Sequence, residues 1–148
     1  MEDKIMSLVR FSNSYPSVFD TLFENNWFEG ENRNYATTNT TLPSVNIKES
    51  SEEFEVEVAA PGFGKNDFHI ELNRNLLTIS SDKQLENKIE KQFTRKEFNY
   101  QSFSRSFTLP NIVDSEKIEA KYENGILKVL IPKKEEAKPK PVRMITIA

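Results

Sequence analysis

Apolar and polar residues alternate through most of the middle of the chain. Residues 54–58 are apolar at every second position, which is typical of a strand with one buried face. The same period of two recurs in other short segments. They comprise residues 45–47, 68–72, 76–80, 117–123 and 126–131. Short alternating segments divided by turn residues predict seven or eight strands, and hence an all-β, immunoglobulin-like antiparallel β-sandwich over residues 44–133.

Two turn residues, Asn124 and Gly125, separate the last two alternating segments. Asn-Gly strongly favours a two-residue β-hairpin, because both residues of a type I′ turn have positive φ. The sequence therefore predicts a hairpin with this turn. Upstream, Phe98 and Phe103 have opposite parity, which predicts one extended strand with a bulge near 101–102.

The segment 81–92 is highly charged, and its apolar residues Leu85 and Ile89 are four positions apart. This spacing fits a short helix. It equally fits a projecting loop that carries an edge strand. The pattern leaves both interpretations open.

The first 43 residues are rich in aromatic side chains but show no sustained alternation. Apolar residues recur every three or four positions from Pro16 to Phe28, which predicts a helix of about three turns. The polar segment 31–41 is predicted to be a linker. Residues 1–43 are thus interpreted as a partly helical or disordered arm, with the alternative that the helix belongs to the main core.

The last 15 residues, 134–148, are charged and spaced by prolines, so they are predicted to form an extended, flexible tail. The tail ends with Ile145 and Ile147, whose side chains would project to the same side about 6–7 Å apart. Such a pair could fill an apolar groove on another molecule, since the spacer 134–144 spans roughly 35–40 Å. Alternatively, the end of the tail pairs with its own domain as an edge strand.

Composition limits the possible chemistry. The chain of 148 residues has no cysteine, one histidine and a net charge of −3. Cysteine-based catalysis, thiolate metal sites and a polybasic nucleic-acid surface are therefore excluded, and no cofactor or metal is expected. The single histidine, His69, is expected on the solvent side of a strand. An enzyme is not predicted, and the absence of an apolar export or membrane segment leads us to expect a cytoplasmic protein.

Several motifs together resemble the small heat-shock proteins, the α-crystallin family of the bacterial and plant type. Residues 120–127, AKYENGIL, are similar to the family pattern A-x-x-x-N-G-[VI]-L. Three further motifs follow the family order. They are VAAPG at 58–62, FSRSFTLP at 103–110 and ITI at 145–147. Two residues depart from the family pattern. Ser102 stands where glycine is common, and Thr108 stands where a basic residue is common.

The resemblance implies an ATP-independent holdase, which binds partly unfolded client proteins and passes them to ATP-dependent refolding chaperones. Apolar side chains of the N-terminal arm would bind the clients. They are Phe11, Phe19, Leu22, Phe23, Trp27 and Phe28. A flexible apolar segment can adapt to many client surfaces.

The resemblance also implies dimers that assemble into larger homo-oligomers. Leu85 and Ile89 would lie on an exchanged loop that pairs near residues 45–47 of a partner, with Arg105 at the same interface. Ile145 and Ile147 would dock in a groove between two strands. The groove residues would be Phe68, Ile70, Leu72, Ile118 and Ala120.

Two other functions fit a β-sandwich of this size. A monomeric or dimeric co-chaperone would need neither the ITI tail nor the aromatic arm. A ligand-binding module, such as one for carbohydrate, would need exposed planar aromatics on the sandwich, but the only tryptophan lies outside it.

Overall fold

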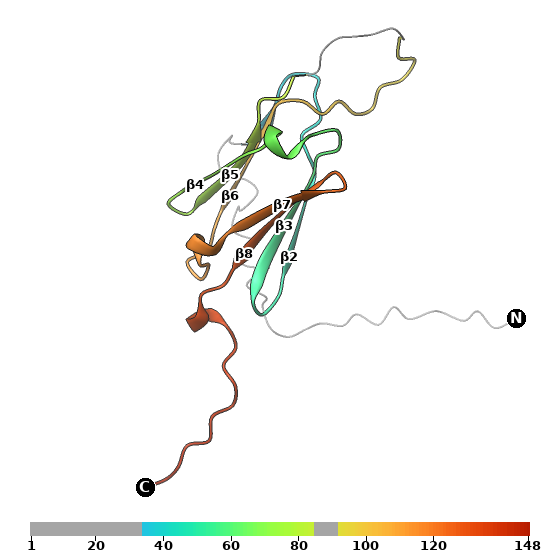
Figure 1. The fold of residues 1–148 in the computed structure, drawn as a ribbon. Coiled ribbons are helices and arrows are strands. Elements are labelled where there is room, and N and C mark those ends of the chain that lie inside the picture. Colours follow the sequence, from blue (N-terminus) through green and yellow to red (C-terminus); the bar gives the residue numbers. More distant parts are fainter. Residues whose placement is uncertain (1–33, 85–91) are drawn as a thin grey trace, which may run out of the picture.

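The computed structural model describes residues 34–84 and 92–148 (Figure 1). This part of the chain contains eight strands and three short 3-10 helices. The strands are β1 (Tyr35–Ala36), β2 (Val45–Glu49), β3 (Glu53–Ala59), β4 (His69–Asn73), β5 (Leu76–Ser81), β6 (Phe103–Thr108), β7 (Glu119–Glu123) and β8 (Ile126–Pro132). The helices are η1 (Lys65–Asp67), η2 (Ser115–Lys117) and η3 (Glu135–Ala137).

The strands form two antiparallel sheets that pack as a sandwich, which confirms the predicted fold class. One sheet has the order β1-β6-β5-β4, and the other has the order β2-β3-β8-β7. All pairings within them are antiparallel. Strands β4 and β7, which belong to different sheets, are the edge strands on one side of the sandwich (Figure 1).

The alternation seen in the sequence determines which side chains form the core. In β3, the residues with odd numbers are partly exposed, whereas Phe54, Val56 and Val58 are at most 1% exposed. Strands β5 and β8 show the same alternation of buried and partly exposed positions. Every second side chain of a strand points to one face, so these strands bury one apolar face each.

The predicted hairpin joins β7 and β8. Asn124 and Gly125 have φ values of 51° and 77°, and Glu123 is paired with Ile126 on either side of the turn. The carbonyl oxygen of Gly125 accepts a 2.9 Å hydrogen bond from the backbone N–H of Ala60. The turn is thereby held against the end of β3.

The prediction that residues 31–41 form a linker is wrong for the described part of that segment. Tyr35 and Ala36 form β1, which pairs with β6. The Asn34 side chain accepts a hydrogen bond from the backbone N–H of Ser106. Pro43 is completely buried. The segment belongs to the sandwich because its backbone and side chains satisfy the edge of β6.

The predicted bulge near residues 101–102 is also absent, because the strand begins only at Phe103. Residues 92–102 form no strand, and the Phe98 side chain is 69% exposed. The change of parity therefore marks the start of the strand. The open question about Leu85 and Ile89, and the helix predicted between Pro16 and Phe28, concern residues outside the described part of the chain.

The tail prediction needs one correction. Residues 134–138 are not a free spacer, since they include the 3-10 helix η3, and Ala137 and Lys138 are partly buried. Beyond them, residues 139–148 have no helix or strand, are exposed, and lead away from the sandwich (Figure 1). The extended tail therefore begins about five residues later than predicted.

Candidate functional site

Apolar side chains of β4 and β7 face the space between the two sheets. In β4, Ile70 is paired with Ile79, and in β7, Ala120 is paired with Val129. Ile79 and Val129 are fully buried core residues. Directly opposed residues of neighbouring strands project to the same face. Ile70 and Ala120 therefore point inward, although each lies on the outermost strand of its sheet.

These inward-facing residues are only partly covered. Ile70 is 38% exposed and Ala120 is exposed, whereas the others are half-buried against the core. We call this apolar surface the β4–β7 edge. It consists of Phe68, Ile70, Leu72, Ile118, Ala120 and Tyr122. All five groove residues predicted from the sequence thus lie on one side of the sandwich.

Tyr122 joins the two strands of this edge and was missed in the sequence. Its ring centroid lies 4.9 Å from that of Phe68, and its hydroxyl donates a 2.7 Å hydrogen bond to the carbonyl oxygen of Ala60. The sequence could have indicated Tyr122, because it lies two positions after Ala120 and therefore projects from the same face of the strand. The Phe68–Tyr122 contact holds together one end of the β4–β7 edge.

The tail isoleucines are almost fully exposed. Ile145 is 85% exposed and Ile147 is 93% exposed. Residues 139–148 form no strand, so the alternative in which the tail pairs with its own domain is not the arrangement observed. The chain therefore leaves both the tail isoleucines and the β4–β7 edge accessible.

Two lysines fasten the base of the tail to the turn between β2 and β3. The Lys133 ammonium group is buried, lies 2.6 Å from Glu49 Oε1 and donates a 2.7 Å hydrogen bond to the Ser50 carbonyl oxygen. The Lys138 ammonium group lies 2.7 Å from a carboxylate oxygen of Glu135 and 3.2 Å from one of Glu52. The pKa of Lys138 is raised, chiefly by the hydrogen bonds to these two carboxylates. The exposed tail thus starts from a fixed point.

Arg105 lies on β6 and points toward the interior of the sandwich, since it is paired with Ile79. Its Nε and Nη2 atoms donate hydrogen bonds of 3.0 and 2.8 Å to the carbonyl oxygen of Pro43. Burial lowers the pKa of the guanidinium group. Arg105 therefore fixes the segment that enters β2, and no carboxylate pairs with it among the described residues.

Two exposed aromatic residues follow the segment 85–91. Phe93 is 67% exposed and Phe98 is 69% exposed, and the Phe98 ring lies 5.9 Å from that of Tyr100. Phe98 was predicted to lie in one extended strand with Phe103, and Phe93 was not singled out in the sequence. Large exposed apolar side chains close together are typical of interaction surfaces.

The comparisons with known proteins agree with this architecture. The sequence pattern of the Hsp20/alpha crystallin family matches residues 46–148, well over half of the chain. The chain belongs to the Hsp20/alpha crystallin family. Family members in this comparison include small heat shock protein C4 of Rickettsia felis, which is 36% identical over 132 residues and covers 86% of this chain and 81% of its own.

Other relatives are similar over most of the chain. Heat shock protein 16 of Schizosaccharomyces pombe is 32% identical over 140 residues, which is 91% of this chain and 96% of the relative. Among solved structures, the small heat-shock protein from Xylella fastidiosa has a TM-score of 0.59 at 29% identity, with 74% of this chain and 98% of that chain covered. Heat shock protein 16.0 from S. pombe has a TM-score of 0.57 at 34% identity, with 72% and 97% covered.

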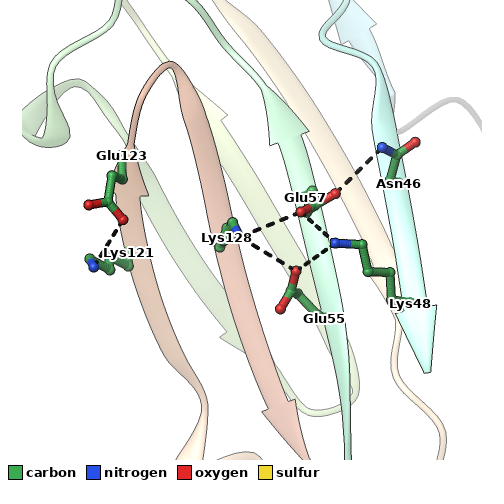
Figure 2. A network of polar contacts seen from close by, with 7 residues as sticks. All are labelled: Asn46, Lys48, Glu55, Glu57, Lys121, Glu123 and Lys128. Carbon is green, nitrogen blue, oxygen red and sulfur yellow. Dashed lines mark hydrogen bonds and ion pairs between the residues drawn. The ribbon is translucent and has the colours of Figure 1, made fainter. Parts of the chain in front are cut away.

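The outer face of the β2-β3-β8-β7 sheet of this Hsp20/alpha crystallin domain carries a network of charges (Figure 2). Lys48 Nζ lies 3.1 Å from Glu55 and 2.8 Å from Glu57, and Lys128 lies within 3.9 Å of both carboxylates. The hydrogen bond from Lys48 lowers the pKa of Glu57 and raises that of Lys48. The charges of this network balance one another, and such a polar surface offers little to apolar partners.

His69 is exposed, and its strand partner is Ser80, on the outer face of the sheet. In residues 34–84 and 92–148, no three His, Asp or Glu side chains are grouped so that they could hold a metal ion. None of the helices in the same ranges is both long and apolar enough to cross a membrane.

The two departures from the family pattern lie immediately before β6 and at its end. Thr108 is exposed at the end of β6, and its strand partner is Leu76. Ser102 is half-buried immediately before β6 and accepts a backbone hydrogen bond from Thr37 at 3.4 Å. A threonine hydroxyl cannot form the ion pair that a basic residue at position 108 could make.

Proposed function

We propose that this protein is an ATP-independent holdase chaperone that assembles from dimers into larger homo-oligomers. One observation supports this proposal above all. A single chain leaves an apolar edge open between its sheets and two apolar tail residues exposed. Exposed apolar surfaces of complementary form favour association, because burial removes them from water. Membership in a family of small heat-shock proteins supports the same function.

The spacing of the tail isoleucines matches that of the β4–β7 edge. Ile145 and Ile147 are two residues apart, as are Ile70 and Leu72 on β4 and Ala120 and Tyr122 on β7. In extended backbone this spacing corresponds to about 6–7 Å. The two isoleucines of one subunit can therefore pack at two successive positions along the edge of another.

The strength of one such contact can be bounded. Burial of two isoleucines contributes on the order of 3–6 kcal/mol before other terms. Ordering the tail and losing translational freedom offset most of this gain. A single contact is therefore weak and reversible, whereas several contacts in a closed assembly reinforce one another.

The proposed dimer uses the other side of the sandwich. Strand β2 is an edge strand, so one row of its backbone groups is free to pair with a strand from a partner. In the proposal, the partner strand comes from the loop with Leu85 and Ile89, and Arg105 stabilises the segment leading into β2. Phe93 and Phe98, exposed just beyond that loop, extend the available apolar surface.

Clients are proposed to bind the aromatic segment of the N-terminal arm between Phe11 and Phe28, which lies outside the described residues. Unfolding proteins expose apolar surface, and its capture requires neither a catalytic step nor nucleotide. Captured clients would then pass to ATP-dependent refolding chaperones in the cytoplasm. A crystal structure of the relative from Xylella fastidiosa has been described as revealing a distinct high order structure, which is consistent with assembly.

Client aggregation provides the test of holdase activity. A thermally labile enzyme is heated with equimolar subunits of this protein, without nucleotide, and light scattering is followed over time. We expect suppressed scattering that does not change when ATP is added. An inert protein of similar mass serves as the control. Scattering equal to that of the client with the inert control would refute the holdase proposal.

A further inference from the structure

Two carboxylates beside the β4–β7 edge have no ion-pair partner among the described residues. Glu71 lies on β4 and Glu119 lies on β7, and both are exposed. Their strand partners are Thr78 and Leu130, so both side chains lie on outer faces, next to inward-facing apolar residues. Neighbouring Glu123 differs, because it is 3.0 Å from Lys121 Nζ.

The edge as a whole is acidic, and the tail is basic. The two strands of the edge carry three glutamates and one lysine, besides His69. The tail from Lys138 to Ala148 contains two lysines and an arginine but no acidic side chain. Lys138 is already bound to Glu52 and Glu135. Lys140 and Arg143 are exposed, and the described residues provide no ion-pair partner for either.

We propose that Glu71 and Glu119 form an acidic rim that selects the basic tail, residues 139–148, of a second copy of this chain. The inference rests on the tail docking described under the proposed function and identifies what gives it specificity. The isoleucines supply apolar burial, whereas the charges steer the encounter and disfavour tails or clients of the wrong charge.

The anchored base of the tail favours a second copy over the same chain. Lys138 fixes the start of the free segment, and Pro139 and Pro141 follow at once. Proline-rich segments are extended and semi-rigid, at about 3.1 Å per residue. The tail also leads away from its own sandwich (Figure 1). To reach its own β4–β7 edge, it would have to reverse within the few residues between Pro141 and Ile145.

Arg143 is the basic residue best placed to contact the rim. It lies two positions before Ile145, so in an extended tail its side chain projects to the same side as both isoleucines. When those isoleucines pack on the edge, Arg143 lies one further step along it, and its apolar stem can cover the edge while the guanidinium group extends outward to the carboxylates of the rim. A guanidinium group pairs well with a carboxylate, because it can donate two parallel hydrogen bonds.

The test uses full-length protein and measures the subunit concentration at which oligomers dissociate to dimers. Static light scattering is recorded at about 50 mM and about 500 mM NaCl, where the screening lengths differ severalfold. We expect Glu119→Gln to raise the midpoint concentration about two- to fivefold at the lower salt, as for loss of one exposed ion pair, and not at the higher salt. The control is Glu53→Gln, the same change two strands away in the same sheet, also at a residue without an ion-pair partner among those described.

Exchange of the two charges gives a stricter test. Arg143→Glu should weaken assembly at low salt, and addition of Glu119→Arg should restore it. The acidic rim would be refuted if the midpoint concentration rose no more in Glu119→Gln than in Glu53→Gln. It would also be refuted if the Arg143→Glu/Glu119→Arg variant did not regain assembly. If each tail docked on the edge of its own chain, the effects of the rim substitutions would not depend on subunit concentration. That result would refute docking on a second copy.

These failures differ from failure of the proposed function. If Ile145→Ala with Ile147→Ala leaves the oligomer mass unchanged, tail docking itself is wrong. If that variant dissociates while the rim variants behave like the control, docking stands and only the acidic rim is wrong.

Discussion

Replacement of Lys133 by methionine tests whether a buried ion pair holds the base of the tail to the domain. Lys133 is 8% exposed, its ammonium group lies 2.6 Å from Glu49 Oε1, and it also lies 4.8 Å from the centre of the Phe54 ring. Methionine keeps a long apolar side chain over Phe54 but removes the charge. The Glu49 carboxylate, whose side chain is 17% exposed, is then left without its counterion.

The magnitude follows from this partial burial. Loss of one partner from a fully buried pair costs about 3–5 kcal/mol. Since Glu49 keeps some contact with water, we expect Lys133→Met to cost about 2–3 kcal/mol. For a domain of roughly 100 residues, this lowers Tm by about 8–12 °C. Glu49→Leu in addition removes the uncompensated charge, so the double variant should recover much of the loss.

Calorimetry at one fixed subunit concentration measures these differences, because association also contributes to the apparent stability. Lys134→Met is the matched control, since Lys134 is adjacent and exposed. We expect its Tm to equal that of the wild type. A Tm for Lys133→Met within about 2 °C of the wild type, or a double variant less stable than both single variants, would refute the reasoning.

Two further predictions concern the charged face and the hairpin. The hydrogen bond from Lys48 lowers the pKa of Glu57, so its stabilising effect is complete above the ordinary pKa and is lost as pH falls through the lowered value. Glu57→Gln should therefore lower Tm at pH 7, and its difference from wild type should shrink only as pH falls below the ordinary glutamate pKa of about 4.3 and vanish below the lowered pKa; a difference that is constant with pH would contradict this. Gly125→Val should lower Tm because φ is 77°, although a Cβ atom would meet Pro61 only at 3.5 Å. Gly125→Ala should lower Tm less, because a side chain without a β-branch is less strained at this φ, and an alanine variant with the Tm of the wild type would contradict the prediction.

The sequence was most informative where a local pattern determines structure. Alternation identified strands such as β3, because burial of one face requires a period of two. The hairpin followed from Asn124 and Gly125, two residue types that readily adopt positive φ. Both features depend on residues that are near one another in the chain.

Features that depend on tertiary pairing were missed or misplaced. Strand β1 has only two residues and exists because β6 offers an edge to pair with. The segment before Phe103 has strand-like residues but no strand partner in the described structure, so its parity was misleading. The anchors at Lys133 and Lys138 join residues distant in sequence, and charge alone could not indicate them.

In the candidate site, too, local patterns were predicted and features that depend on tertiary pairing were not. Parity placed Ile70 and Ala120 on the inner face of their strands, but it could not distinguish a core residue from one at an open edge. Their partial exposure follows from the sheet order, in which β4 and β7 are outermost. Strand order is set by long-range pairing, and the alternation within one strand does not indicate which strands pair with it.

In the proposed assembly, one chain completes the burial of its apolar edge only with the tail of another. Light scattering after size exclusion tests it by comparing the mass of the wild type with that of Ile145→Ala/Ile147→Ala. The control is Val142→Ala/Met144→Ala, because these residues are exposed in the same tail but have the opposite parity. We expect a large oligomer for the wild type and the control, and dimers for the isoleucine variant. An isoleucine variant with the mass of the wild type would contradict it.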